Sequence, residues 1–429
     1  MTENINKLLR EFKNCYENCD FEKIDELNKE IQGYYERNGL TKTENYARYL
    51  YDLSLCQTET DKLREAVKSA KAAFDIAEEL NLEILCTAAA TSLGVAYGYA
   101  GNKRPALFWL KKAYDLTYNL VKDRDSEQHN QCLADAALNL GSAYYDIRDY
   151  NNALDFHKTA LRLQTAENDD YCDNLNLIAY DLEKLGRFDE AAVYLRSSLD
   201  ILGRLIGEND KDYAANLSYL ASVYKKGGDF QKAAVEYERV IRLFKQTGHG
   251  DDICCGEAMN KAADIYLKMG DDPGALKLRN EALEIFEKTT GTQSLFYANC
   301  LRDMGEIYFN NSIYGKAIIC LTKALDIKKS IFAPADPEYF KDAILLTKIY
   351  LENKQPDKSC EIMEYLFNNI DEKHPSYRDI LFFLASRYVL TDTDTDRLFD
   401  LYEKYLKLDP DATIEEFLEL AFDGPKKLK

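Results

Sequence analysis

The sequence predicts an all-α protein, a solenoid of about nine or ten helix-turn-helix pairs followed by a C-terminal capping helix. The first observation is that six small residues each lie twelve positions before an alanine: Gly94 and Ala106, Gly141 and Ala153, Ala179 and Ala191, Ala221 and Ala233, Ala263 and Ala275, Gly305 and Ala317. The second is that Thr347, Ala385 and, more weakly, Ser54 extend this series at similar spacing. Because repeats pack only on their neighbours, a chain of 429 residues needs no separate globular cores.

The ends of the chain depart from the repeat pattern, as the ends of a solenoid tend to do, because one face of a terminal unit meets water. Residues 3–37 have the pattern of an atypical helix pair, and a last helix is expected from Thr413 to Phe422. We therefore predict an N-terminal cap at 1–40, a repeat array at 41–410 that is most regular at 170–350, and a capping helix with a short basic tail at 411–429.

One central unit shows how a pair is built. Residues 210–227 carry apolar side chains at a helical period, and Gly227-Gly228-Asp229 then interrupts it. A second helix is expected from Phe230 to about Lys245. The apolar faces of both helices are too wide for one partner helix to cover, so the next pair must cover the remainder.

The small residues, numbered as position 8 of each repeat, predict a close approach of the two helices. Glycine inside a helix costs about 1 kcal/mol relative to alanine, so Gly94, Gly141 and Gly305 require a compensating gain. A larger side chain there would push the paired helices apart. Two connections stand out as exceptions: the long one at 122–130, and Ser330–Glu338 with its two prolines. Residues 391–396 are expected to form a polar turn in the last pair.

Composition excludes several classes of function. The 55 basic and 74 acidic side chains give a net charge of −19, which disfavours nucleic acid as a partner. No apolar run is long enough to span a membrane and the N-terminus lacks a signal-peptide pattern, so we expect a cytoplasmic protein without a membrane partner. The 11 cysteines are scattered, which favours reduced thiols in helix interfaces and no metal site.

Residues 214–224 and 228–234, with the lead-in at 206–210, resemble the 42-residue tetratricopeptide repeats of the kinesin light chain-like group. The resemblance is good over about 170–350 and looser elsewhere. It implies a right-handed superhelix that binds protein or peptide partners, and it does not imply cargo transport. A looser resemblance links the chain to the peptide-sensing regulators of Gram-positive bacteria. Residues 1–40 are too short and too acidic for the DNA-binding domain that some of them carry.

By analogy with this repeat type, the first helix of each pair lines the concave surface. Asparagines at inward positions can hydrogen-bond the backbone of an extended peptide, and inward tyrosines can form side-chain pockets. Inward cations are offset by as many acidic residues, so the predicted groove is neutral on an acidic body and favours a peptide with acidic groups. The predicted binding residues are Asn139, Asn176 and Asn260 for backbone contacts, Tyr180 and Tyr219 for pockets, and Lys225, Lys261, Lys268 and Arg302 for acidic groups.

The sequence shows no combination of residues that predicts catalysis. The four histidines stand in unrelated settings, and no phosphate loop or nucleophile motif is present. We therefore expect no enzymatic activity and no cofactor. The predicted function is that of an adaptor that binds an extended peptide or a partner helix on its concave face. The alternative is a peptide-responsive regulator of the quorum-sensing receptor type without a DNA-binding domain. Self-association is left open.

Overall fold

The computed structural model describes residues 2–18, 20–123, 126–391 and 394–423. These residues form 21 α-helices and no β-strand, which along the chain amount to ten successive pairs and one last helix. The predicted all-α fold, with nine or ten pairs and a capping helix, is confirmed. The predicted basic tail at 424–429, and parts of the connections at 122–130 and 391–396, lie outside the described residues.

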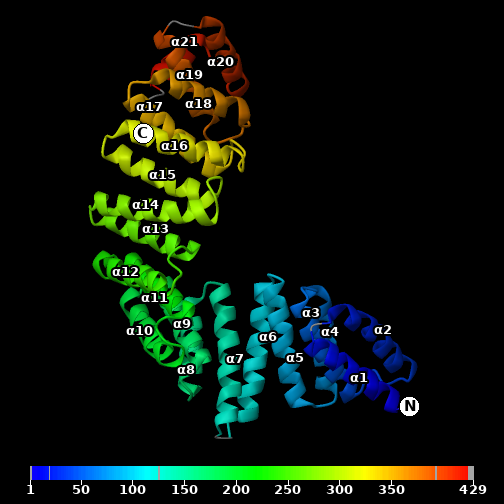
Figure 1. The fold of residues 1–429 in the computed structure, drawn as a ribbon. Coiled ribbons are helices and arrows are strands. Elements are labelled where there is room, and N and C mark those ends of the chain that lie inside the picture. The colour runs from blue at the N-terminus through cyan, green and yellow to red at the C-terminus, as the bar shows by residue number, and fades with distance from the viewer. Residues whose placement is uncertain (1, 19, 124–125, 392–393, 424–429) are drawn as a thin grey trace. The chain divides into compact units, whose positions relative to one another are not determined.

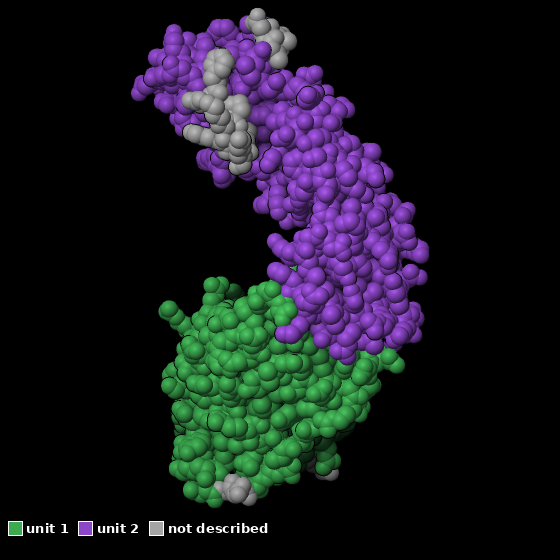
Figure 2. Space-filling model, turned by 90° about the vertical axis from the view of Figure 1, so that its left-hand side faces the viewer, with its two compact units in different colours: residues 1–229 green, residues 230–429 purple. Residues whose placement is uncertain are grey.

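The chain divides into two compact units, which we describe separately (Figure 2). Unit 1 comprises residues 1–229, and its helices pack mainly on the helices next to them in sequence (Figure 1). The first helices of neighbouring pairs also touch, as α3 and α5 do. The helices of unit 1 are α1 Thr2–Glu17, α2 Phe21–Arg37, α3 Glu44–Glu59, α4 Leu63–Glu79, α5 Glu83–Tyr99, α6 Lys103–Val121, α7 Glu127–Asp146, α8 Tyr150–Leu163, α9 Asp169–Lys184, α10 Phe188–Leu205 and α11 Lys211–Gly227.

Unit 2 comprises residues 230–429 and follows the same rule of packing between sequence neighbours. An exception lies at its end, where α21 packs on α19 as well as on α20. The helices of unit 2 are α12 Phe230–Gln246, α13 Ile253–Lys268, α14 Asp272–Thr289, α15 Leu295–Asn310, α16 Tyr314–Lys329, α17 Pro337–Glu352, α18 Pro356–Asn369, α19 Tyr377–Thr391, α20 Thr395–Leu408 and α21 Ile414–Asp423.

The turn inside a pair has the same backbone shape in eight of the ten pairs. In eight pairs, one residue with φ between 56° and 84° lies seven positions after the position-8 residue. Glycine adopts this left-handed conformation without steric cost, whereas other residues pay about 1–2 kcal/mol. The eight residues are Asp61, Gly101, Arg148, Gly186, Gly228, Gly270, Ser312 and Lys354.

The predicted close approach at position 8 is confirmed at the three glycines. A Cβ atom added to Gly94 would lie 2.5 Å from Leu110 Cγ, and one added to Gly305 would lie 2.8 Å from Leu321 Cγ. At Gly141 it would lie 2.5 Å from His157 Cδ2. Carbon atoms in contact are normally 3.5–4.0 Å apart, so only glycine fits these positions without movement.

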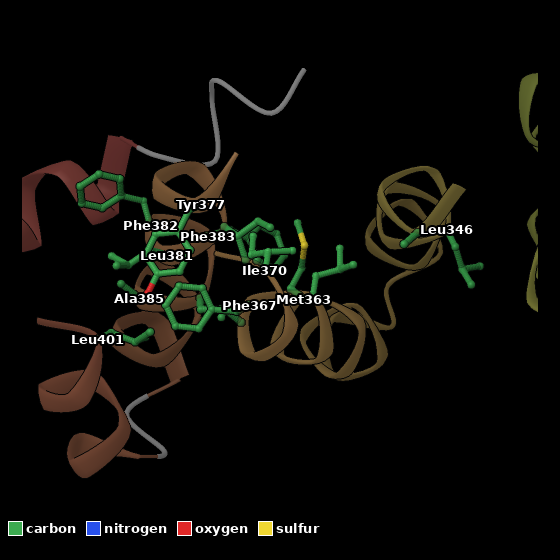
Figure 3. Packing of buried hydrophobic residues seen from close by; sticks show 14 of the residues in the cluster. Leu346, Met363, Phe367, Ile370, Tyr377, Leu381, Phe382, Phe383, Ala385 and Leu401 are labelled. Carbon is green, nitrogen blue, oxygen red and sulfur yellow. The ribbon is translucent and has the colours of Figure 1, made fainter. Parts of the chain in front are cut away.

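The C-terminal end of unit 2 has a core rich in aromatic side chains. Met363 and Phe367 on α18 face Tyr377 and Leu381 on α19 (Figure 3). Phe417 of α21 is fully buried against this cluster, so α21 covers an end of the array that would otherwise meet water. The predicted capping helix therefore corresponds to α21.

A series of ion pairs runs through the interior of unit 2. The Arg279 guanidinium on α14 contacts Asp264 Oδ1 on α13 and Asp303 Oδ2 on α15, each at 2.5 Å. Only 3% of the Arg279 side chain is exposed, so these two carboxylates balance a buried charge. Further along, Lys328 Nζ is 2.7 Å from Asp342 Oδ2, and both side chains are buried.

Candidate functional site

Unit 1 contains an open groove of about 1160 Å³, which we call the N-terminal groove. The first helices of three consecutive pairs, α3, α5 and α7, form most of it, and the end of α6 closes one side. Its lining residues are Arg48, Tyr51, Leu55, Thr58, Glu59, Asn81, Leu82, Glu83, Ile84, Leu85, Thr87, Ala88, Thr91, Ser92, Val95, Tyr99, Thr117, Leu120, Val121, Gln128, His129, Cys132, Asp135, Ala136 and Asn139.

The groove exists because α5 presents small side chains between α3 and α7. Thr87, Ala88 and Thr91 line it in successive turns of the helix. Both threonine hydroxyls donate to carbonyl oxygens one turn earlier, Thr87 Oγ1 to Glu83 O and Thr91 Oγ1 to Thr87 O, each at 3.0 Å. Because these hydroxyls are already bonded within the helix, α5 offers a ligand mainly methyl groups.

Helix α5 is also unusual in its lack of charge. No charged residue occurs from Ile84 to Tyr99, although a helix with a solvent-facing side normally carries polar or charged residues there. Ile84 and Tyr99 line the groove and are 78% and 73% exposed. Large apolar side chains are thus left in water at both ends of α5.

The charged residues of the groove are mostly acidic. Glu59, Glu83 and Asp135 come from α3, α5 and α7, whereas Arg48 supplies the only guanidinium or ammonium group among the lining residues. Arg48 Nη2 is already 2.6 Å from Glu44 Oε1. Burial, together with the nearby Asp170 carboxylate, raises the pKa of Asp135.

One of the nine predicted binding residues, Asn139, lines this groove. Tyr99, which the sequence analysis did not include among them, lines it as well. Asn139 lies on α7 and is half-buried. Asn139 is thus common to the groove and to the predicted binding surface. The other lining residues of the groove lie in repeats that precede the regular region at 170–350.

Three more predicted residues gather on α9 and α11 of unit 1. The rings of Tyr180 and Tyr219 stack with centroids 4.4 Å apart, and 41% of Tyr180 remains exposed. Asn176 Oδ1 is buried and has no hydrogen-bond partner among the described residues, and the Tyr219 hydroxyl is buried near the Glu183 carboxylate. Burial raises the pKa of Tyr219, and the neighbouring Glu183 carboxylate adds to this effect.

The predicted cations are in different environments. Lys225 on α11 is half-buried, and its neighbour Lys226 donates to Glu183 Oε1 at 2.7 Å. In unit 2, Lys261 and Lys268 are exposed on α13, and no ion pair of theirs is found in the described part of the chain. Arg302 is paired with Glu306 at 3.0 Å and with Asp303 at 3.1 Å.

Asn260, the last of the predicted residues, is half-buried on α13 and accepts a contact of 3.6 Å from Cys300 Sγ on α15. The nine residues therefore fall into two units, with Asn139, Asn176, Tyr180, Tyr219 and Lys225 in unit 1 and Asn260, Lys261, Lys268 and Arg302 in unit 2. Within unit 1 the structure brings Asn176, Tyr180 and Tyr219 to one face, while Asn139 lies in the N-terminal groove.

His157 and most of the described cysteines are buried in helix packing, whereas Cys132 and Cys254 are exposed. His157 Nδ1 is 2.6 Å from Asp181 Oδ2, with both side chains buried between helices of unit 1. The cysteines within the described ranges are all free thiols. In the same residues no three metal-ligating side chains converge, and no helix is long and apolar enough to cross a membrane.

Comparison with known protein families supplies the identity of the repeats. A family profile described as tetratricopeptide repeat matches residues 132–202, 170–246 and 255–330. Residues 132–246 and 255–330 of this chain are tetratricopeptide repeats. The matched ranges include the units on which the position-8 spacing is most regular, and the helix pairs continue on both sides of them.

Several solved structures are similar to this protein at low identity. The quorum sensor NprR of B. thuringiensis, without ligand, is 16% identical, with 86% of this chain and 99% of that chain covered and a TM-score of 0.44. The C-terminal part of a repeat protein from Cytophaga hutchinsonii is 15% identical over 66% and 97%, with a TM-score of 0.47. A kinesin light chain-type protein of Podosopora anserina is 18% identical over 48% and 97%, with a TM-score of 0.43. No curated protein matches significantly.

Proposed function

We propose that this tetratricopeptide repeat protein is a non-catalytic scaffold that binds an extended peptide or a partner helix on the inward faces of its first helices. The N-terminal groove is the observation that carries this proposal. It is built from the first helices of three consecutive pairs, and its volume of about 1160 Å³ exceeds the roughly 300–1,000 Å³ typical of small-molecule pockets. A peptide segment suits a groove of this size and openness better than a metabolite does.

The stacked pair of Tyr180 and Tyr219 supports an extension of the same binding mode within unit 1. An exposed tyrosine ring offers contact area at low entropic cost, and aromatic residues are enriched where binding energy concentrates. The predicted roles of Asn176 and Lys225 there, and of Asn260, Lys261, Lys268 and Arg302 in unit 2, belong to this proposal. The expectation that the partner carries acidic groups rests on these cations.

The test is a selection of peptides from a displayed random library on the purified full chain. Selected peptides are then measured by fluorescence anisotropy against wild type and Ala88→Trp, which places an indole ring in the groove. Val193→Trp is the matched control, because Val193 is 53% exposed on the second helix α10. We expect Ala88→Trp to weaken binding about tenfold or more and Val193→Trp to leave it unchanged.

Peptides that bind both tryptophan variants as tightly as wild type would refute the groove as the binding surface. The role of the tyrosine pair is tested separately with Tyr180→Ala, and with Tyr118→Ala on α6 as the control because its ring is 49% exposed. The alternative of a peptide-responsive regulator stays a prediction. A change in radius of gyration on adding a selected peptide would favour it.

A further inference from the structure

The chemistry of the N-terminal groove points to a particular class of peptide, and this inference rests on the proposed function. Its first basis is the apolar strip on α5. Ile84 and Tyr99 lie fifteen residues apart, so the strip is about 22 Å long at 1.5 Å per residue. Leu55 on α3 and Leu120 on α6 extend the apolar surface to the sides. Apolar side chains gathered in a concave surface are a common feature of ligand sites.

The second basis is the sign of the charges around the strip. Glu59, Glu83 and Asp135 stand on three different helices, and among the lining residues only Arg48 opposes them. Arg48 is engaged by Glu44 outside the groove lining, while Glu59 accepts a hydrogen bond of 2.7 Å from the Tyr16 hydroxyl. The groove therefore has an excess of negative charge that its own residues do not balance.

The third basis is the hydrogen bonding of one of these carboxylates. Asp135 is held by Gln131 Nε2 at 2.8 Å, a neutral donor that leaves the charge uncompensated. This carboxylate is therefore accessible to an ammonium or guanidinium group of a ligand, which it would attract. An anionic ligand would face repulsion from all three carboxylates.

We propose that the N-terminal groove selects a peptide segment that presents apolar side chains together with lysine or arginine. The apolar side chains lie along the α5 strip between Ile84 and Tyr99, and the cationic groups reach Glu83 and Asp135. This ligand class is opposite in charge to the acidic peptide expected from the lysines of the central repeats. The ligand class proposed for the N-terminal groove therefore differs from the one that the sequence predicts for the cationic positions further along the chain.

The test uses three labelled peptides of about twelve residues: one with leucine and lysine, one with glutamate in place of lysine, and one with serine in place of leucine. Binding to the full chain is measured by fluorescence anisotropy at physiological ionic strength. We expect the leucine-lysine peptide to bind at least about tenfold more tightly than the other two. Because the chain carries a net charge of −19, the contribution of the groove must be separated from general attraction.

The double variant Glu83→Lys/Asp135→Lys makes that separation. Its matched control, Asp115→Lys/Asp155→Lys, changes the net charge equally at exposed positions on the second helices α6 and α8. We expect the groove variant to weaken the leucine-lysine peptide at least tenfold and the control to change it less than threefold, with helicity unchanged by circular dichroism in both.

Two results would overturn the inference. Equal weakening by both double variants would show that net charge and not the groove attracts the peptide. Binding of the leucine-glutamate peptide at least as tight as that of the leucine-lysine peptide, and sensitive to Ala88→Trp, would contradict the ligand class while leaving the proposed function in place. If instead no selected peptide of any composition depends on the groove, the proposed function itself fails.

Discussion

Replacing Gly94 by alanine tests the packing rule on which the whole array depends. The added Cβ would lie 2.5 Å from Leu110 Cγ and 3.1 Å from the Leu110 backbone nitrogen, so rotation of the leucine side chain alone does not remove the overlap. Helices α5 and α6 must separate by about 1 Å to restore normal contact. Overpacking of this kind costs about 1–3 kcal/mol, and the higher helix propensity of alanine returns up to about 1 kcal/mol.

We therefore expect Gly94→Ala to lower the free energy of unfolding by about 1–2 kcal/mol. Gly98→Ala in the same helix is the matched comparison, because its Cβ would meet nothing closer than Ala106 Cβ at 4.0 Å. That variant should be neutral or more stable by up to about 1 kcal/mol. The assay is hydrogen exchange of the α5 and α6 amides together with urea unfolding. If Gly94→Ala proves as stable as Gly98→Ala, the close approach at position 8 is not what requires glycine.

Three further predictions concern stability. Arg148 and Ser312 adopt a positive φ although neither is glycine. Arg148→Gly and Ser312→Gly should therefore each raise the free energy of unfolding, measured by urea titration, by about 0.5–1 kcal/mol. Unchanged or lower values would show that these turns are not strained. Arg279→Met removes the buried guanidinium that contacts Asp264 and Asp303, and it should cost about 1.5–3 kcal/mol by thermal unfolding. Arg187→Met breaks only an exposed pair with Glu190 and should lower the stability far less. Burial and neighbouring carboxylates raise the pKa of Asp173, so ionisation of this side chain destabilises the folded state as the pH rises through the usual and then the raised pKa. The difference in Tm between Asp173→Asn and wild type should therefore increase, in favour of the variant, between about pH 3.5 and pH 7. A difference that stays constant over this range would contradict the raised pKa.

The fold could be predicted from the sequence because its determinants are local and repeated. Position 8 must be small, since Leu110, His157 and Leu321 occupy the space in front of it, and this requirement appears directly in the residue spacing. The left-handed turn residue could be read only in part. Gly101, Gly186 and Gly228 signal it, whereas Arg148, Ser312 and Lys354 adopt the same φ without any sequence sign. The uniform helix-pair geometry imposes the conformation on them.

The site was harder to predict because regular spacing and ligand binding are different properties. All the predicted binding residues except Asn139 lie in 170–350, where the repeats are most alike, while the groove lies where small side chains on α5 leave space. A signal was available in the uncharged stretch from Ile84 to Tyr99, which is unusual in a chain with so many charged residues. For the predicted lysines and Arg302, the position in the repeat indicates the helix face but not the carboxylates with which each side chain pairs. Arg302 has its carboxylates within unit 2, and only the folded neighbours reveal them.

The left-handed turns also determine where the chain tolerates a change in length. In every regular pair the turn residue lies seven positions and the alanine twelve positions after the position-8 residue. The number of residues between successive pairs, in contrast, varies. Removing one residue from the turn inside a pair would rotate the second helix by about 100° and carry its alanine away from the interface. A residue added between pairs changes only a connection. Insertions and deletions are therefore expected to accumulate between pairs, which makes those connections the natural places to lengthen, shorten or graft onto this array.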